Sequence, residues 1–505
     1  MYKERWEKSF WLEHIVILML GVLTVFGTLY RTGVITSGFH MLDDHELIRF
    51  NLAFTENNAS LGETIRYAIL NDFGGGRYRP LYWLERVTGS KLWGDELTCW
   101  NCYTAVKGVL TFYFLYYTAR YLKYNRIVSF LFVGIILFGS QFTPWFRCAN
   151  QESTGLLFCA LTLYFIARQY FYGKYNGLLY NAVIVLGAVL CGLTKESFVL
   201  FMPVFIALKF WLEYCQKGEF IRCLKGNLAV YVFIALSALI NVGMILFYVG
   251  VDHVSYAGFH EATALTEYWS GIRYSLKFNL GSYTIAGGVF LFAILLYVSE
   301  IPKERRKKYL GFTVISVYVM TVQLIAHAKS LMWERYIIPW IVGYALLFVL
   351  LGYRIFEQNR WRRSIYIVAL AILFLAEAPK AYRMSRDYAY VGQILKLYFQ
   401  NILDHTEEDS QIVCALSAGE LNLSTECWLE VHERTQAYSY DLNTGEFVNM
   451  VQLKGTVPES FSWEKAQVVV CDGDQVEQIL QLMGISEESQ YDVSEYNGYH
   501  VICRL

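Results

Sequence analysis

Long apolar segments dominate this chain, and they restrict what it can fold into more than any other feature does. A helix that crosses a bilayer needs roughly 20 mostly apolar residues, because lipid offers its backbone no hydrogen-bond partner. We identify eleven such segments, near 13–30, 101–120, 127–143, 153–170, 178–194, 197–212, 227–250, 284–299, 309–327, 336–353 and 364–380. Only 17% of the residues are charged, against about 25% in ordinary soluble proteins. The sequence therefore predicts an all-α polytopic membrane protein with about eleven transmembrane helices.

The distribution of Lys and Arg predicts how these helices are oriented. With the N-terminus in the cytoplasm, the segments on that side carry twenty-one Lys and Arg, and the four short segments on the other side carry six. An excess on the cytoplasmic side is typical of membrane proteins. We therefore expect a multi-pass protein of the cell membrane, whose first apolar segment is a retained helix and not a cleaved signal peptide. The net charge is close to zero, so nothing suggests a nucleic-acid partner.

Two large segments then lie outside the membrane, on the extracytoplasmic side. The first is the loop 31–100, in which Ser60 and Glu63 have the spacing of a capping box and predict an interfacial helix. Pro80 suits the first turn of the next helix.

The second large segment is C-terminal and begins near residue 381. Its composition is more polar, and the strand-like runs QIVCALSA, QVVVCDGD and YHVICRL occur together with a helix-like run, DQVEQILQLMG. We predict a transmembrane catalytic domain over 1–380 and a small extracytoplasmic α/β domain over 381–505.

An acidic segment, MLDDHELIRF, follows the first apolar segment and contains Asp43 and Asp44. One interpretation is a solvated loop. The other is a general base, because a carboxylate at the membrane interface is partly desolvated and its pKa rises toward a useful value. A metal site would need more ligands at suitable spacing than this segment supplies, so we predict none.

Further polar residues fall at the same predicted membrane face. Arg77 and Arg79 in GGGRYRP either contact lipid headgroups or recognise a phosphate, whose oxygens match the arginine fork. Glu152, at the start of the fourth apolar segment, is either part of a helix cap or a second acidic residue facing the same cavity.

Two more basic residues, Lys195 and Arg335, fall at the same predicted membrane face. Lys195 and Glu196 interrupt a very long apolar stretch in CGLTKESFVLFMP; they are either the tight turn of a helical hairpin or an anion site, since charges at membrane depth are costly and often functional. Arg335 in MWERYIIPW either reaches to the interface or pairs with a phosphate or another partner.

The order of these motifs resembles the GT-C glycosyltransferases, and in particular the dolichyl-phosphate-mannose O-mannosyltransferases and their bacterial relatives. The resemblance covers roughly residues 10–360. It rests on the acidic pair after the first span, RYRPL, NQESTGLL, the K-E turn in LTKES, and ERYIIP. The C-terminal domain has no counterpart in that family, and no tetratricopeptide repeats follow the membrane region.

The resemblance implies a glycosyltransferase that moves a sugar from a polyprenyl-phosphate donor to an acceptor hydroxyl with inversion. The acceptor is a glycan, a lipid or a protein, and the lipid-linked sugar is a donor substrate rather than a cofactor. Asp43 is the implied base, with Asp44 and Glu152 as alternative or assisting acids. The implied donor-phosphate ligands are Arg77, Arg79, Lys195 and Arg335.

Two other classes of membrane protein compete with this interpretation. A lipid-linked-glycan transporter or flippase is typically built from half-repeats with charges at mid-membrane depth, whereas here only Lys107 lies well within an apolar segment and no half-repeat is visible. A polysaccharide polymerase shares the setting but is not expected to carry the first-loop acidic pair together with RYRPL. A non-catalytic scaffold would explain none of the polar clusters.

Overall fold

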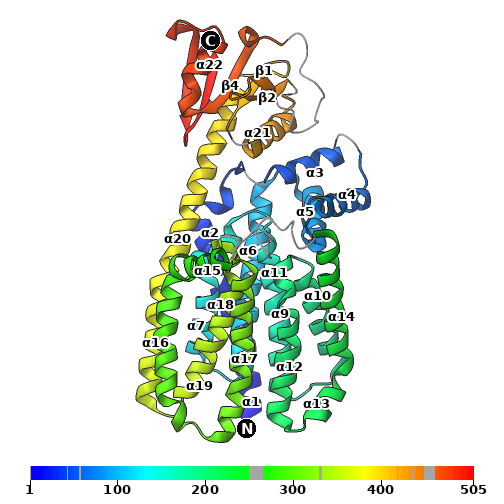
Figure 1. Ribbon diagram of the computed structural model, residues 1–505, viewed down its shortest axis with the longest axis vertical. Helices are drawn as coiled ribbons and strands as arrows, with labels where there is room; N and C mark the ends of the chain where they lie inside the picture. The colour runs from blue at the N-terminus through cyan, green and yellow to red at the C-terminus, as the bar shows by residue number, and fades with distance from the viewer. Residues whose placement is uncertain are drawn as a thin grey trace. The chain divides into compact units, whose positions relative to one another are not determined.

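The computed structural model describes residues 2–41, 44–55, 58–249, 265–328, 332–417, 419–434, 436–447 and 461–505. The chain forms two compact units (Figure 1). Unit 1 consists of Met1–Thr32, Arg66–Glu85 and Asn101–Ser385, and unit 2 consists of Gly33–Ile65, Arg86–Trp100 and Arg386–Leu505. The predicted boundary near 381 falls inside one continuous helix, α20 (Arg360–Asp404).

Helices make up unit 1. Its longer helices, some of which continue into unit 2, are α1 (Tyr2–Gly21), α4 (Leu61–Gly74), α5 (Pro80–Trp93), α6 (Leu97–Tyr121), α7 (Arg126–Leu137), α9 (Gln151–Tyr172), α10 (Leu178–Gly192), α12 (Met202–Lys217), α14 (Leu228–Met244), α15 (Leu265–Tyr274), α16 (Gly281–Tyr297), α17 (Lys303–Ala326) and α20. Its short helices are α2 (Gly27–Arg31), α8 (Thr143–Phe146), α11 (Glu196–Val199), α13 (Phe220–Gly226), α18 (Ile338–Tyr344) and α19 (Gly352–Phe356).

Short 3-10 and π-helical segments link several of these helices. The 3-10 segments are η3 (Ser140–Phe142), η6 (Val298–Glu300) and η7 (Glu334–Tyr336), and the π-helical segments are η1 (Val22–Phe26), η4 (Ile245–Val249), η5 (Ser275–Asn279) and η8 (Ala345–Leu351). The helices α9, α10, α12 and α14 pack on one another, and α12 also packs on α17, which contacts α18 and η8.

Eight helices of the described chain are long and apolar enough to cross a membrane, or nine if the bent pair Arg126–Leu137 and Ser140–Phe146 forms one span. This is fewer than the eleven predicted. The segment 101–120 is helical within α6, but Lys107 and many Tyr and Thr side chains reduce its apolar character. The segment 178–194 forms α10, which has only 15 residues. The prediction of a mostly helical chain with many candidate membrane spans is nevertheless confirmed in its broad form.

Burial differs strongly among these candidate spans. Ile338–Phe356 is 89% buried and forms the centre of its helix group, whereas Gly281–Glu300 is only 17% buried. The outer face of α16 exposes Ile285, Val289 and Phe292. Large apolar side chains on such a face are suited to lipid and not to water.

A six-stranded mixed sheet forms the core of unit 2, with strand order β3-β2-β1-β4-β6-β5. Strands β2, β1 and β4 are parallel, and β3, β6 and β5 are antiparallel to their neighbours. The strands are β1 (Gln411–Ala415), β2 (Ala437–Asp441), β3 (Glu446–Phe447), β4 (Ala466–Asp472), β5 (Tyr491–Tyr496) and β6 (Tyr499–Arg504). The three predicted strand-like runs are β1, β4 and β6, and the predicted helix between the last two is α22 (Val476–Leu482), so the C-terminal α/β prediction is confirmed.

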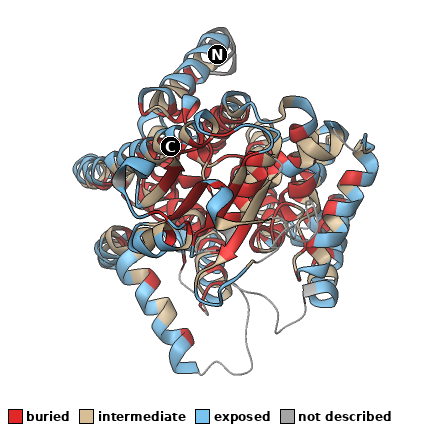
Figure 2. Ribbon diagram, turned by 90° about the horizontal axis from the view of Figure 1, so that it is seen from above, coloured by how far each residue is buried: buried red, intermediate tan, exposed pale blue. Residues whose placement is uncertain are grey.

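Both faces of the central strands β1, β4 and β6 are largely buried, and buried residues are drawn in red in Figure 2. Because side chains alternate along a strand, Ile412 and Cys414 pack on one face with Tyr398 of α20, while Val413 packs on the other with Ile479 of α22. The first face is also covered by α21 (Gly419–Val431) and by α3 (His45–Thr55). This two-sided burial explains why the strands are nearly continuous apolar runs in the sequence.

The loop 31–100 is ordered in helices α3, α4 and α5, as its sequence predicts. At the start of α4 the Ser60 hydroxyl accepts a hydrogen bond from the Glu63 amide at 3.2 Å and donates one to the Glu63 carboxylate at 2.7 Å. Pro80 is the first residue of α5. The capping-box and proline predictions for this loop are therefore confirmed.

Candidate functional site

The first ion pair of unit 1 joins the loop after α4 to the turn after α10. Gly76 adopts a positive φ of 71°, which a residue without a Cβ tolerates, and turns the chain so that Arg77 faces α11. The Arg77 guanidinium donates two hydrogen bonds to Glu196, at 2.9 and 3.2 Å, and the Tyr78 amide donates a third at 3.2 Å. Burial opposes the charge of Arg77, but Glu196 outweighs it and raises the Arg77 pKa. Arg77 is therefore a fixed cation.

A second ion pair lies next to the first. Arg79 donates to both carboxylate oxygens of Asp72, at 2.5 and 3.3 Å, and to the side-chain oxygen of Gln151 at 3.2 Å. Its guanidinium also lies over the Tyr82 ring, 4.7 Å from the centroid. Sequence reasoning missed Asp72; the available signal was an acidic residue seven positions before Arg79, separated from the glycine run by Phe73.

The third ion pair is the most deeply buried. Lys195 donates to the Oε1 atom of Glu152, and the two residues are 4% and 1% exposed. The other oxygen of Glu152, Oε2, has no hydrogen-bond partner within the described part of the chain. The cap of α9 is Asn150, whose side chain accepts from the Glu152 amide at 3.0 Å, so the Glu152 carboxylate does not cap its helix.

Lys195 is held in an unusual electrostatic environment. Burial lowers the Lys195 pKa to about 8; the ion pair with Glu152 opposes this shift, and Arg77 and Arg335 add to it. The Lys195 ammonium also lies 3.6 Å from the centre of the Tyr336 ring, a favourable cation–π distance. Two neighbouring cations therefore act on Lys195 together with one carboxylate.

Tyr336 brings further groups to the same place. Arg335 donates a hydrogen bond of 2.9 Å to the Tyr336 hydroxyl. The His327 ring stacks on the Tyr336 ring with centroids 5.0 Å apart and an angle of 7°. His327 is 2% exposed, and neither of its nitrogens has a hydrogen-bond partner among the residues that the structure describes. Burial lowers the His327 pKa to about 3, so the imidazole is neutral. The sequence carried no pattern that singled out His327.

The structure thus gathers five predicted residues of unit 1 into one polar cluster, which we call the Lys195 cluster. Its members are Asp72, Arg77, Arg79, Glu152, Lys195, Glu196, His327, Arg335 and Tyr336. Four of these side chains are cationic and three are carboxylates. A cluster with one surplus positive charge and unpartnered polar atoms at Glu152 and His327 is suited to an anionic ligand that also carries hydroxyl groups.

The predicted aspartates have a different status. Asp43 lies outside the described residues. Asp44 belongs to unit 2, where it is buried and accepts a hydrogen bond of 3.0 Å from the His40 amide. Nearby in the same unit, His45 contacts Ser424 at 3.1 Å. Asp44 is thus not part of a solvated loop.

Lys107, the one basic residue predicted well within a span, forms a closed triangle in unit 1. Its ammonium donates to Glu85 at 2.5 Å and to the Thr154 hydroxyl at 2.9 Å, and Thr154 donates to the other Glu85 oxygen at 2.5 Å. Each oxygen of Glu85 has a donor, so this triangle is suited to holding α5, α6 and α9 together.

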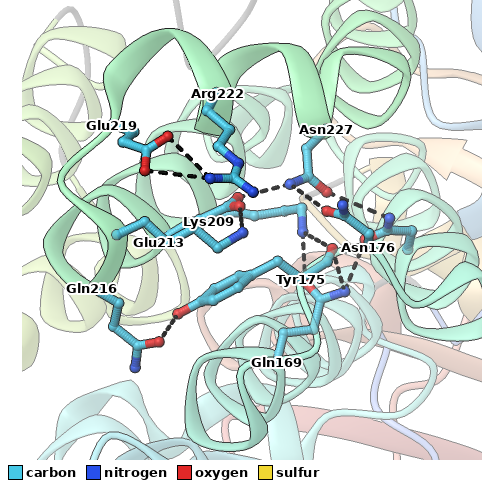
Figure 3. A network of polar contacts seen from close by, with 11 residues as sticks. Gln169, Tyr175, Asn176, Lys209, Glu213, Gln216, Glu219, Arg222 and Asn227 are labelled. Carbon is cyan, nitrogen blue, oxygen red and sulfur yellow. Dashed lines mark hydrogen bonds and ion pairs between the residues drawn. The ribbon is translucent and has the colours of Figure 1, made fainter.

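A larger network lies at the opposite end of α9 (Figure 3). Lys209 of α12 donates to the Gln169 side chain at 2.6 Å and to the Tyr175 carbonyl at 3.2 Å. Glu213 accepts from Asn227 at 2.7 Å and from Lys217 at 2.6 Å. We call this set the Lys209 network. Within the described ranges, no group of three His, Cys, Asp or Glu side chains is arranged to hold a metal ion.

No protein-family model matches the chain, and no curated protein matches it by sequence. Among solved structures it is similar to an oligosaccharyltransferase of Archaeoglobus fulgidus, crystallised in complex with zinc and sulfate. The match covers 97% of this chain and 73% of that chain, at 11% identity and a TM-score of 0.44. A similarity at this level establishes neither a common fold nor a common activity, so membership of the GT-C group stays a prediction.

Proposed function

We propose that this protein is an integral membrane glycosyltransferase of the GT-C type, which moves a sugar from a polyprenyl-phosphate donor to an extracytoplasmic acceptor hydroxyl. The observation that carries the proposal is the buried Lys195–Glu152 pair with one unpartnered carboxylate oxygen. A lysine and a glutamate of this kind, buried at the end of apolar helices, combine a phosphate ligand with a proton acceptor.

Lys195 is the proposed principal ligand of the donor phosphate. An arriving phosphate competes with Glu152 for the Lys195 ammonium, and the surplus positive charge of the Lys195 cluster favours this exchange. Arg335 acts from the same side of the cluster. Arg77 and Arg79 are held by Glu196 and Asp72, so they contribute a fixed positive field, which stabilises the charge that develops on the leaving phosphate.

The reaction is a single displacement at the anomeric carbon. A carboxylate takes the proton of the acceptor hydroxyl, whose oxygen forms a new bond to the anomeric carbon as the bond from that carbon to the phosphate oxygen breaks. The electron pair of that bond leaves on the polyprenyl phosphate. Asp43 is the base implied by the family resemblance, with Asp44 as its alternative. Glu152 becomes a further proton acceptor once the phosphate occupies Lys195.

The test is turnover by the purified full-length chain in lipid. A panel of polyprenyl-phosphate sugars is supplied with hydroxyl acceptors, and release of polyprenyl phosphate is measured. We expect release with at least one sugar, and its loss in Asp43→Asn while the protein stays folded in the membrane. Near-normal turnover by a folded Asp43→Asn protein would remove Asp43 as the base. Movement of the labelled lipid across the bilayer without release of its sugar would overturn the proposal in favour of a flippase.

A further inference from the structure

A hollow in unit 1 lies between two helix connections at the end of the bundle that carries the basic run 302–310. The turn from α16 to α17 forms one side, and the turn from α19 to α20 forms the other. It contains about 480 Å³ of empty space, part of it open to solvent. The side chains that matter for its chemistry are Tyr297, Glu300, Arg305, Tyr309, Arg354 and Arg362.

Among the described residues, three arginines and one carboxylate line this hollow. Arg354 is held by Glu357 at 2.8 Å and by the carbonyl oxygens of Leu122 and Lys123 at 3.0 and 3.1 Å. Arg362 donates to Glu300 at 2.5 Å. Two of the three guanidinium groups are therefore already oriented, and the lining has a surplus of positive charge, which suits an anion.

The arginines are accompanied by aromatic rings and by the starts of two long helices. The Arg362 guanidinium lies 3.9 Å from the centre of the Tyr297 ring, which restrains its plane. The first turn of α17 follows Pro302 and receives no side-chain cap, so backbone N–H groups at the positive end of this helix supplement the arginines. The N–H groups at the start of α20 are instead capped by Asn359.

The surroundings of the hollow are apolar in the way that a membrane interface requires. Leu310 on α17 is 63% exposed and Trp361 on α20 is 80% exposed. Both side chains belong to candidate membrane spans, and tryptophan is favoured at the headgroup level. The distribution of Lys and Arg predicts that this end of the bundle faces the cytoplasm, where anionic lipids give the membrane surface a negative potential.

We propose that this hollow binds the phosphate group of an anionic membrane lipid. Arg305, Arg354 and Arg362 contact the phosphate oxygens, and the exposed apolar side chains beside them contact the acyl chains. The proposal does not depend on the glycosyltransferase proposal, because it rests on residues at a different helix end from the Lys195 cluster.

The experiment uses native mass spectrometry of the purified full-length protein in a neutral detergent, with added phosphatidylglycerol, phosphatidylcholine or inorganic phosphate. We expect phosphatidylglycerol to bind in preference to phosphatidylcholine. Arg305→Gln removes one phosphate ligand and is expected to weaken phosphatidylglycerol binding by about tenfold. Lys307→Gln is the matched control, because it removes the same charge two residues along α17 but does not line the hollow.

A third variant is expected to strengthen phosphatidylglycerol binding instead of weakening it. Glu300→Gln removes the carboxylate that pairs with Arg362 and is expected to tighten phosphatidylglycerol binding several-fold. Equal losses in Arg305→Gln and Lys307→Gln would show a diffuse basic surface and would overturn the proposal. Inorganic phosphate that binds as tightly as the lipid would also overturn it, because the acyl chains would then contribute nothing. The proposal is supported if phosphatidylglycerol binds more tightly than inorganic phosphate and this binding is weakened by Arg305→Gln.

Discussion

Two buried lysines lie at opposite ends of α9 and have opposite kinds of partner. Lys195 contacts Glu152 near the start of α9, and Lys209 contacts Gln169 near its end, about 25 Å away along the helix at 1.5 Å per residue. Lys209 donates to two neutral oxygens, and both oxygens of the neighbouring Glu213 are occupied. At the other end, one oxygen of Glu152 has no hydrogen-bond partner in the described ranges.

This difference separates a structural network from a candidate binding site. The Lys209 network links the ends of α9, α10 and α12 to the start of α14, and its hydrogen bonds satisfy the polar groups that would otherwise be costly to bury. The Lys195 cluster contains buried atoms of Glu152 and His327 that have no partner among the described residues, and native proteins seldom retain such atoms without a ligand or a function. Both ends contain a buried lysine, so burial alone does not distinguish them.

The largest expected effect tests this distinction through two matched substitutions, Glu152→Gln and Glu213→Gln. Glu152→Gln keeps the shape of the side chain but removes both the carboxylate charge beside Lys195 and the further proton acceptor, and it should lower sugar transfer by about 100- to 10,000-fold. Glu213→Gln should leave transfer per folded molecule within about twofold of the unaltered protein, because its contacts stabilise helix ends. The measurement is release of polyprenyl phosphate, normalised to folded protein. Similar losses of sugar transfer in both variants would show that the two ends of α9 do not differ in function.

The free energy of unfolding, in contrast to sugar transfer, should depend on the Lys209 network, and the expected effect is smaller. Lys209→Met leaves the buried oxygen of Gln169 without a donor, which should lower the free energy of unfolding by roughly 1–3 kcal/mol. Lys225→Met serves as the control, because Lys225 is exposed on α13 and such changes usually stay within about 0.5 kcal/mol. Thermal unfolding of the purified variants measures both. An Lys209→Met protein as stable as the control would show that the network is not structural.

A third prediction concerns pH and applies to the Lys195 end alone. The Lys195 pKa lies near 8, so its ammonium is present below that value and is lost as the pH rises through it. The kcat/KM for the donor should therefore be flat below pH 7 and about tenfold lower at pH 9 than on the plateau. In Lys195→Arg the cation persists, and the decline should disappear. Glu152, Arg77 and Arg335 also face the Lys195 ammonium. If kcat/KM still declines in the same way in Lys195→Arg, the titrating group is not Lys195.

Much of the architecture was predictable because it depends on local patterns. Apolar runs marked most of the helices of unit 1, and Val- and Ile-rich runs marked strands β1, β4 and β6. The predicted count of spans exceeds the eight or nine described helices that are long and apolar enough to cross a membrane, because an apolar run does not reveal how long its helix is. Residues 178–194 satisfied the apolar criterion, yet their helix ends after 15 residues at Gly192.

The site was predictable only in part, for a different physical reason. Charges that interrupt apolar runs are costly, so Lys195 stood out in the sequence. Arg77 stood out because it follows a glycine run, and Glu152 because it begins an apolar segment. Their pairing depends on tertiary contacts between residues far apart in the chain, such as Arg77 with Glu196, and no local pattern encodes it. His327 was missed because a single histidine after an apolar run carries no periodic signal. Lys209 and Glu213 resembled the ordinary polar end of a span, although both are buried.

The smallest expected effect concerns the edge of the Lys209 network. Lys217 pairs with Glu213 four residues earlier on α12, but 37% of its side chain is exposed. An ion pair of this type contributes about 0.3–0.5 kcal/mol, so Lys217→Ala should lower the unfolding temperature far less than Lys209→Met. Added salt should narrow the remaining difference from the unaltered protein, because exposed pairs are screened. If Lys217→Ala lowers the unfolding temperature as much as Lys209→Met does, the Lys209 network depends on its exposed ion pair and not on its buried neutral hydrogen bonds. Both ends of α9 would then depend on an ion pair between a lysine and a glutamate.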